Sequence, residues 1–121
     1  MPLVLLTLCL LAYGLLIPWL GFYWDDWSQV WTWHTQGAEG LVRLCSSDRP
    51  LQGYVLAALT RALGNSPLPW HILALVGRWL SAVALWLVLR VVWPKRAWEA
   101  AATAMLFAAY PGFTQQPIAR V

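Results

Sequence analysis

Residues 70–93 read WHILALVGRWLSAVALWLVLRVVW, and this apolar run decides the class of the fold. A helix of this length crosses the hydrocarbon core of a bilayer even when it is tilted. The run ends in Arg90 and in the turn Pro94-Lys95-Arg96, where basic side chains are expected to meet lipid headgroups. It therefore predicts a membrane-spanning helix.

The composition of the whole chain also indicates a membrane protein. Of its 121 residues, 60% are hydrophobic and only 11% are charged, whereas soluble domains carry about 25% charged residues. This balance leaves too little polar surface to cover a soluble globule. The eight Lys and Arg residues are scattered along the chain rather than gathered on one face, so we expect no nucleic-acid partner.

Two further apolar segments predict crossings on either side of the first run. Residues 3–20 are rich in leucine, and they lack the basic start and the small-residue cleavage site of the alternative, a cleaved signal peptide. Residues 97–110 are rich in alanine and form either a third crossing or a helix buried in protein. We therefore expect an all-α fold, an integral membrane helical bundle of about three transmembrane helices at 3–20, 70–93 and 97–110.

A long loop, residues 21–69, separates the first two predicted crossings. Within it, residues 51–63 place apolar side chains at helical spacing and polar ones elsewhere on the wheel, which predicts a helix lying on the bilayer surface. The following cluster of turn-forming residues predicts a turn before the long span; it consists of Asn65, Ser66, Pro67 and Pro69.

The density of basic residues predicts the orientation in the membrane. The short turn 90–99 holds three basic residues, whereas the loop 21–69 holds three arginines and four acids. Cytoplasmic loops carry the excess of Lys and Arg. We therefore expect a cytoplasmic N-terminus, an extracytoplasmic loop 21–69 and one multi-pass membrane region, 1–121, in a bacterial plasma membrane.

The stretch Gly21-Phe22-Tyr23-Trp24-Asp25-Asp26-Trp27 holds the first candidate for chemistry. Adjacent carboxylates repel each other and resist burial, so their position at a membrane face calls for a reason. One of them can act as a general base toward a sugar hydroxyl, and its neighbour can bind a divalent cation or a basic partner. The structural alternative is a pair of acids that stabilises a helix N-terminus.

Trp27 is a candidate for stacking against a sugar. If residues 24–33 are helical, Trp24, Trp27 and Trp31 share one face, and Asp25 and Gln29 lie on another. Such a stripe is either a sugar-binding platform or an aromatic anchor at the membrane interface.

Two arginines are candidates for binding a phosphate. The planar fork of Arg49 suits a phosphate, or it pairs with a nearby acid such as Asp48, Asp25 or Asp26. Arg78 lies eight residues into the predicted span, roughly 12 Å from its outer end. A charge at that depth is expected to face protein or water rather than lipid.

The arrangement of these motifs resembles the opening of the polytopic membrane glycosyltransferases of the C superfamily. This superfamily includes the protein O-mannosyltransferases and the lipid A aminoarabinose transferases. The resemblance covers essentially the whole chain and is carried by Trp24-Asp25-Asp26-Trp27, Arg49-Pro50-Leu51, Trp70-His71-Ile72-Leu73 and Tyr110-Pro111.

The resemblance implies transfer of a sugar from a polyprenyl-phosphate donor to an extracytoplasmic acceptor. Asp25 or Asp26 would then be the general base, and a divalent cation, Mg²⁺ or Mn²⁺, would lie at Asp26. Because the family has many more spans, we expect this chain to be an N-terminal fragment that is inactive alone, with the remaining spans or another protein as partner. The alternative is a small non-enzymatic membrane subunit that anchors a larger partner.

Overall fold

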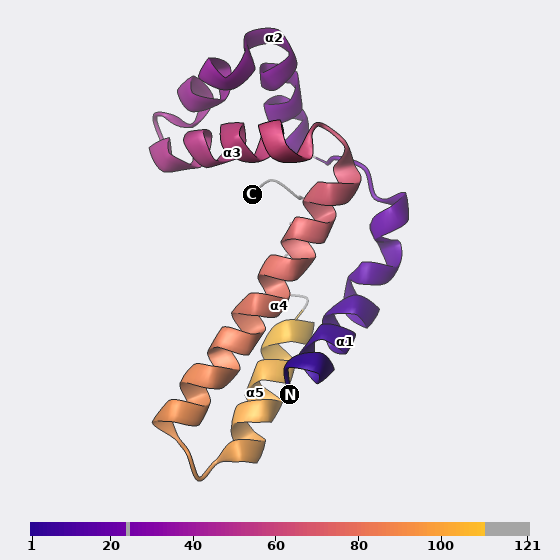
Figure 1. Cartoon of the computed structure of the whole chain (residues 1–121), viewed down its shortest axis with the longest axis vertical. Coiled ribbons are helices and arrows are strands. Elements are labelled where there is room, and N and C mark those ends of the chain that lie inside the picture. The colour runs from indigo at the N-terminus through magenta and orange to yellow at the C-terminus, as the bar shows by residue number, and fades with distance from the viewer. Residues whose placement is uncertain (24, 111–121) are drawn as a thin grey trace. The chain divides into compact units, whose positions relative to one another are not determined.

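The computed structural model describes residues 1–23 and 25–110, and within these residues it contains only helices, which confirms the all-α fold. The elements are α1 (Pro2–Ala12), the 3₁₀ helix η1 (Gly14–Trp19), α2 (Asp25–Cys45), α3 (Pro50–Leu63), α4 (Pro67–Val92) and α5 (Ala97–Ala109) (Figure 1). The chain divides into two compact units. We name them the span unit (residues 1–19 and 71–110) and the loop unit (Leu20–Trp70).

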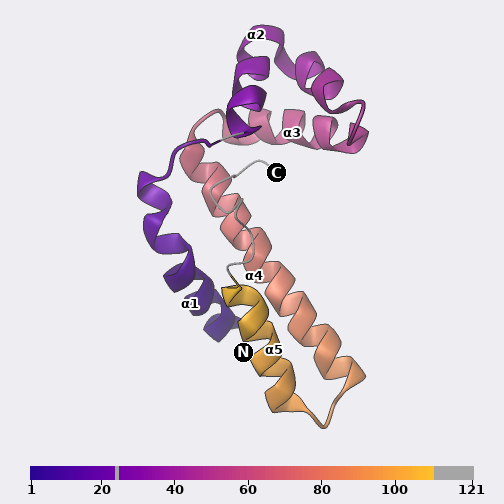
Figure 2. The ribbon, with the colours of Figure 1, turned by 180° about the vertical axis from the view of Figure 1, so that it is seen from behind.

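The span unit is held together by a core that α1, α4 and α5 share. Its fully buried side chains are mostly small: Leu5 and Cys9 from α1, Ala82 from α4, and Ala104 and Ala108 from α5. Small side chains let helices approach closely, which favours packing in an apolar environment. α1 and α5 lie side by side in both views (Figures 1 and 2). The indole N–H of Trp79 also donates to the backbone oxygen of Pro2 at 2.9 Å, which links α4 to the start of α1.

The first predicted crossing, 3–20, is not one continuous α-helix. α1 ends at Ala12, and the chain continues after Tyr13 as the 3₁₀ helix η1, which contains Pro18. Proline has no backbone N–H and its ring crowds the preceding turn, so a regular α-helix is disfavoured through this position.

The second predicted crossing is confirmed as a helix, but it begins three residues before Trp70. Pro67 and Pro69, which we expected in a turn, instead lie in the first turn of α4. Proline is tolerated there because the first backbone N–H groups of a helix have no partner within the helix.

The third predicted segment, 97–110, is confirmed as α5 and ends one residue earlier, at Ala109. Within residues 1–23 and 25–110, α4 alone is long and apolar enough to cross a membrane by itself.

The loop unit consists of α2 folded onto α3. α2 breaks in its middle at Gly37, whose φ of 65° and ψ of −154° lie outside the helical region (Figure 1). This conformation is open almost only to glycine. The sequence admits a helix over residues 24–33 only as a condition and predicts none for residues 38–45, which are also helical.

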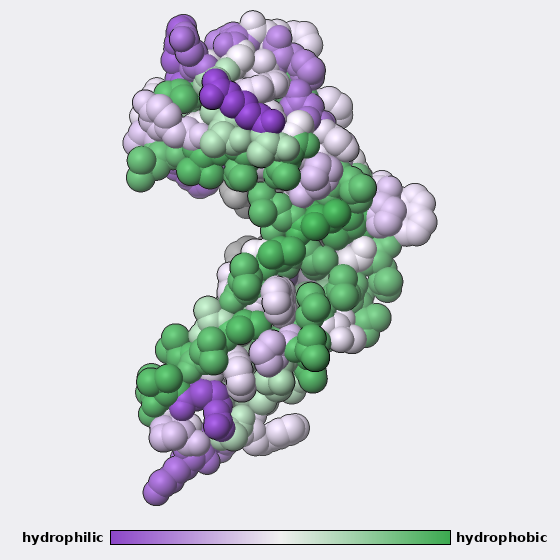
Figure 3. Space-filling model, viewed as in Figure 1, coloured by the Kyte–Doolittle hydropathy of each residue, from purple (hydrophilic) through white to green (hydrophobic). Residues whose placement is uncertain are grey.

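The helix predicted over residues 51–63 is confirmed as α3, with one more residue at its start, and its place on a bilayer surface stays a prediction. One face of α3 packs on α2 through Gly53, Leu56, Ala57 and Thr60, all of which are buried. Three side chains of the predicted apolar face, Leu51, Tyr54 and Val55, are 55–78% exposed, whereas Leu59 packs against this core. Figure 3 shows the row of apolar side chains that α3 presents on its surface.

Candidate functional site

The two predicted acids start α2, and of the two side chains the structure describes that of Asp26. Asp25 is the first residue of α2, and its side chain lies outside the described part of the structure. Asp26 is fully buried, and its backbone N–H donates to the backbone oxygen of Tyr23 at 3.1 Å. Burial of a carboxylate is unfavourable without compensation, which the positive end of a helix dipole supplies in part.

Asp26 lies on the buried face of α2, and the neighbouring tryptophans lie on the exposed face. Gln29, one turn after Asp26, is also buried, whereas the side chains of Trp27 and Trp31 are 60% and 72% exposed. The ring of Phe22 meets that of Trp27 edge to face, at 6.3 Å between centroids. Trp24, the third member of the predicted stripe, lies outside the described residues.

One contact links α2 to the connection between α3 and α4, and a second lies between that connection and the start of α4. The side chains of His34 and Asn65 are within hydrogen-bond distance, at 3.1 Å between Nε2 and Nδ2. Trp70 is 1% exposed, and its indole N–H donates to the backbone oxygen of Gly64 at 2.9 Å. Buried indole groups generally need such a partner. The first contact links the first half of α2 to the connection between α3 and α4, and the second fixes Trp70 against that connection.

Arg49 forms the ion pair that the sequence left as one of two alternatives. Its Nε lies 3.6 Å from Oδ2 of Asp48, and both side chains are more than half exposed. Arg49 is also the residue that precedes α3, which begins at Pro50. Exposed pairs of this kind contribute only about 0 to 1 kcal/mol, so the guanidinium is free to exchange Asp48 for another anion.

Arg78 packs against protein, in agreement with the orientation expected from its depth. It lies near the middle of α4, and its Cζ is 4.3 Å from the centroid of the Tyr13 ring. The hydroxyl of Tyr13 donates to the backbone oxygen of Tyr110 at 3.2 Å. A cation over an aromatic face is stabilised by up to about 2 kcal/mol when water is excluded. Tyr13, where α1 ends, thus links all three helices of the span unit.

The structure places the predicted site residues in both compact units. Asp25, Asp26, Trp27 and Arg49 belong to the loop unit, and Arg78 belongs to the span unit. Among the side chains that the structure describes, no group of three or more His, Cys, Asp or Glu residues is placed to hold a metal ion. The divalent cation at Asp26 stays a prediction.

The sequence did not reveal a groove between the second half of α2 and α3. It has a volume of about 540 Å³ and combines two arginines and a tyrosine with small apolar residues; it is lined by Ala38, Glu39, Val42, Arg43, Tyr54, Ala57, Ala58 and Arg61. Arg43 pairs with Glu39 at 3.4 Å. The i, i+4 spacing of Glu39 and Arg43 is visible in the sequence, but only the fold brings Arg61 to the same groove.

A scan of protein-family models, a search of curated proteins and a search of solved structures found no match to this chain.

Proposed function

We propose that this chain belongs to a membrane-embedded inverting glycosyltransferase that uses a polyprenyl-phosphate-linked sugar. The observation that carries the proposal is Asp26, a fully buried carboxylate at the start of α2, directly after the first apolar segment. A chain retains a buried acid against its desolvation penalty when the acid has a structural or chemical task.

In the proposed reaction Asp26 is the general base, and Asp25 is the alternative. The carboxylate accepts the proton of an acceptor hydroxyl as its oxygen attacks the anomeric carbon. The bond between that carbon and the phosphate oxygen breaks, polyprenyl phosphate leaves with the bonding electrons, and the configuration is inverted. The resemblance also implies a divalent cation at Asp26, which takes no part in the bond changes described here.

Aromatic and basic side chains supply the binding of the donor in this proposal. The exposed face of Trp27, with Trp31 one turn later, stacks on the sugar. Arg49 exchanges its weak pair with Asp48 for the donor phosphate, and Arg78 is the second candidate for this contact. Extracytoplasmic acceptors reach the loop unit in the orientation that the basic residues predict.

The lengths of α4 and of α1 with η1 support two of the three proposed membrane crossings. At 1.5 Å per residue, the 26 residues of α4 reach about 39 Å, more than the roughly 30 Å of the hydrocarbon core. α1 and η1 together add up to about 28 Å, because the 3₁₀ helix rises about 2.0 Å per residue. In this proposal the exposed apolar face of α3 rests on the outer surface of the bilayer.

Replacing Asp26 by asparagine tests the proposal, because asparagine keeps the shape and removes the base. The protein, expressed from its complete reading frame, is assayed in membranes with polyprenyl-phosphate mannose carrying a tritiated sugar. We expect Asp26→Asn to lower transfer of the label by at least about 100-fold, the usual contribution of a general base. Glu39→Gln, which removes an exposed carboxylate of the same unit, should leave transfer unchanged.

The same assay separates the enzyme from the non-enzymatic anchor that the sequence left open. The broad exposed apolar surface of α3 and α4 is what favours an anchor. An anchor tolerates the double variant Asp25→Asn with Asp26→Asn, and it transfers no label in any form. Full transfer by Asp26→Asn combined with loss in Asp25→Asn would move the base to Asp25.

A further inference from the structure

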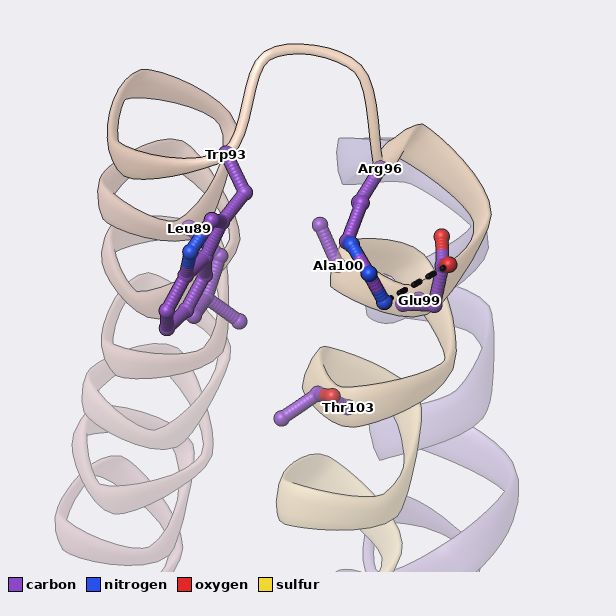
Figure 4. A pocket seen from close by; sticks show the side chains of 6 residues that line it. All are labelled: Leu89, Trp93, Arg96, Glu99, Ala100 and Thr103. Carbon is purple, nitrogen blue, oxygen red and sulfur yellow. Dashed lines mark ion pairs between the residues drawn. The ribbon is translucent and has the colours of Figure 1, made fainter.

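A cleft opens between the end of α4 and the start of α5, away from the proposed catalytic residues in the chain (Figure 4). Its volume is about 370 Å³, within the range of ligand sites. Leu89 of α4 and Trp93, which follows α4, form one wall. The other wall consists of Arg96, which precedes α5, and of residues of its first two turns; these are Glu99, Ala100 and Thr103. The cleft therefore has an apolar side and a charged rim.

Basic residues are dense in the sequence around the cleft, and one of them, Arg96, lines it. Arg90, Lys95 and Arg96 lie within seven residues, and Glu99 is the acid closest to them in the sequence. Nη1 of Arg96 lies 3.6 Å from Oε1 of Glu99, and both side chains are more than half exposed. Because such a pair is weak and screened by salt, a phosphate can take the place of the carboxylate at Arg96.

The position of the cleft fits a lipid. α4 ends at Val92, and the exposed rings of Trp93 and Trp98 flank the turn, as is typical of the level of the headgroups. Leu89 lies one turn deeper along α4, so the apolar wall continues toward the hydrocarbon. Basic pockets between membrane helices on the cytoplasmic side commonly bind anionic headgroups.

We propose that this cleft binds one anionic phospholipid of the cytoplasmic leaflet. The headgroup phosphate contacts Arg96, with Lys95 beside it, and an acyl chain lies along Leu89 and Trp93. This inference rests on the three crossings of the proposed function, but it does not depend on glycosyl transfer. Free phosphate would match the rim but not the apolar wall, so the proposed occupant is the lipid.

Native mass spectrometry of the full chain tests the site. The protein is released from detergent micelles that contain equal amounts of phosphatidylglycerol and phosphatidylcholine, and the bound lipids are counted. We expect phosphatidylglycerol to be preferred, and Lys95→Gln with Arg96→Gln to reduce the preference by about fivefold for each basic residue removed. Arg43→Gln with Arg61→Gln, which removes the same charge from the loop unit, should retain the preference.

A variant that keeps every charge tests the cleft itself. Thr103 is exposed on the cleft wall, so Thr103→Leu should fold normally while it narrows the space for the acyl chain. We expect Thr103→Leu to lose most of the preference and Thr103→Ser to keep it. A preference that survives Thr103→Leu would show attraction by charge alone and would overturn the proposal. Displacement of phosphatidylglycerol by millimolar inorganic phosphate would also overturn it.

Alkaline extraction of membranes separates the failure of this proposal from that of the membrane topology. Release of the chain by carbonate would contradict both proposals, since the cleft then has no leaflet beside it. A chain that resists extraction but binds both lipids equally contradicts the lipid site alone.

Discussion

Gly53 determines how closely the two helices of the loop unit approach. A Cβ atom at this position would lie 2.8 Å from Cα of Val42 and 3.0 Å from the backbone oxygen of Leu41. Both neighbours are backbone atoms, which cannot rotate away as the end of a flexible side chain can.

We expect Gly53→Ala to destabilise the protein by about 1 to 3 kcal/mol, because α2 and α3 must separate to admit the methyl group. Thermal unfolding of the full chain in detergent, followed by circular dichroism, measures the effect. Gly77→Ala is the matched control, since Gly77 is also helical and no atom lies within 4 Å of its added Cβ. It should be neutral or stabilising by up to about 1 kcal/mol. Equal stability of the two variants would contradict the close packing at Gly53.

At the scale of single residues, the sequence identified candidate site residues, but it did not predict how far their side chains are buried. The pair Asp25-Asp26 stood out because charged residues are rare in this chain. Asp26 is buried because its face of α2 packs inward. The rotation of α2 about its own axis, which decides that face, is set by tertiary packing. The pair of Arg49 with Asp48 was among the predicted alternatives because adjacent residues in a loop meet whatever the fold is.

The break in α2 is the main feature at the scale of elements. Gly37 holds φ at 65° and ψ at −154°, and this turns one 21-residue element into two shorter helices. The buried face of the second half then meets α3 around Leu41 and Leu56, both in the core of the loop unit. A straight α2 would carry this face away from α3.

We expect Gly37→Ala to destabilise the loop unit by about 1 to 3 kcal/mol, the usual penalty for a side chain forced into a backbone conformation that favours glycine. Limited proteolysis of the full chain, followed at Arg43 and Arg61, reports the loss of protection. Thr35→Ala serves as the control, because Thr35 is exposed on the same helix and its hydroxyl bonds only to the backbone oxygen of Trp31. If the two variants are cleaved at the same rate, the break at Gly37 is not required.

The elements that the sequence predicted well are those with a strong local signal. α3, α4 and α5 match their predicted ranges within three residues, since apolar spacing and proline act over short distances. The 3₁₀ segment η1 and the helix at 38–45 were not predicted. The first depends on a change of helix type that hydropathy does not encode, and the second is stabilised by packing on α3.

At the scale of the whole molecule, the composition predicts a membrane protein, and α4 is the one helix in the described part that meets the length requirement alone. The other two proposed crossings depend on packing against α4, because side chains of α1 and α5 lie in the same core as those of α4. The groove and the cleft could not be predicted, since each brings together residues from two elements.

Labelling with a membrane-impermeant maleimide tests the proposed topology. Cys45 is replaced by serine, and the buried Cys9 is retained as an unreactive residue. We expect Ser47→Cys to be labelled in intact cells, because the loop unit is proposed to be outside. Lys95→Cys should be labelled only after the membrane is made permeable. Labelling of both residues on one side would contradict the crossing by α4, and the reverse pattern would invert the orientation.

The length of α5 has a mechanical consequence for a surrounding bilayer. Its 13 residues reach about 20 Å, some 10 Å less than the hydrocarbon core. A bilayer adapts to a short apolar helix by thinning around it, at a fraction of a kcal/mol per Å of mismatch. If α5 crosses the membrane as proposed, the lipid beside it would therefore be compressed, and a thinner membrane would reduce that deformation around α5.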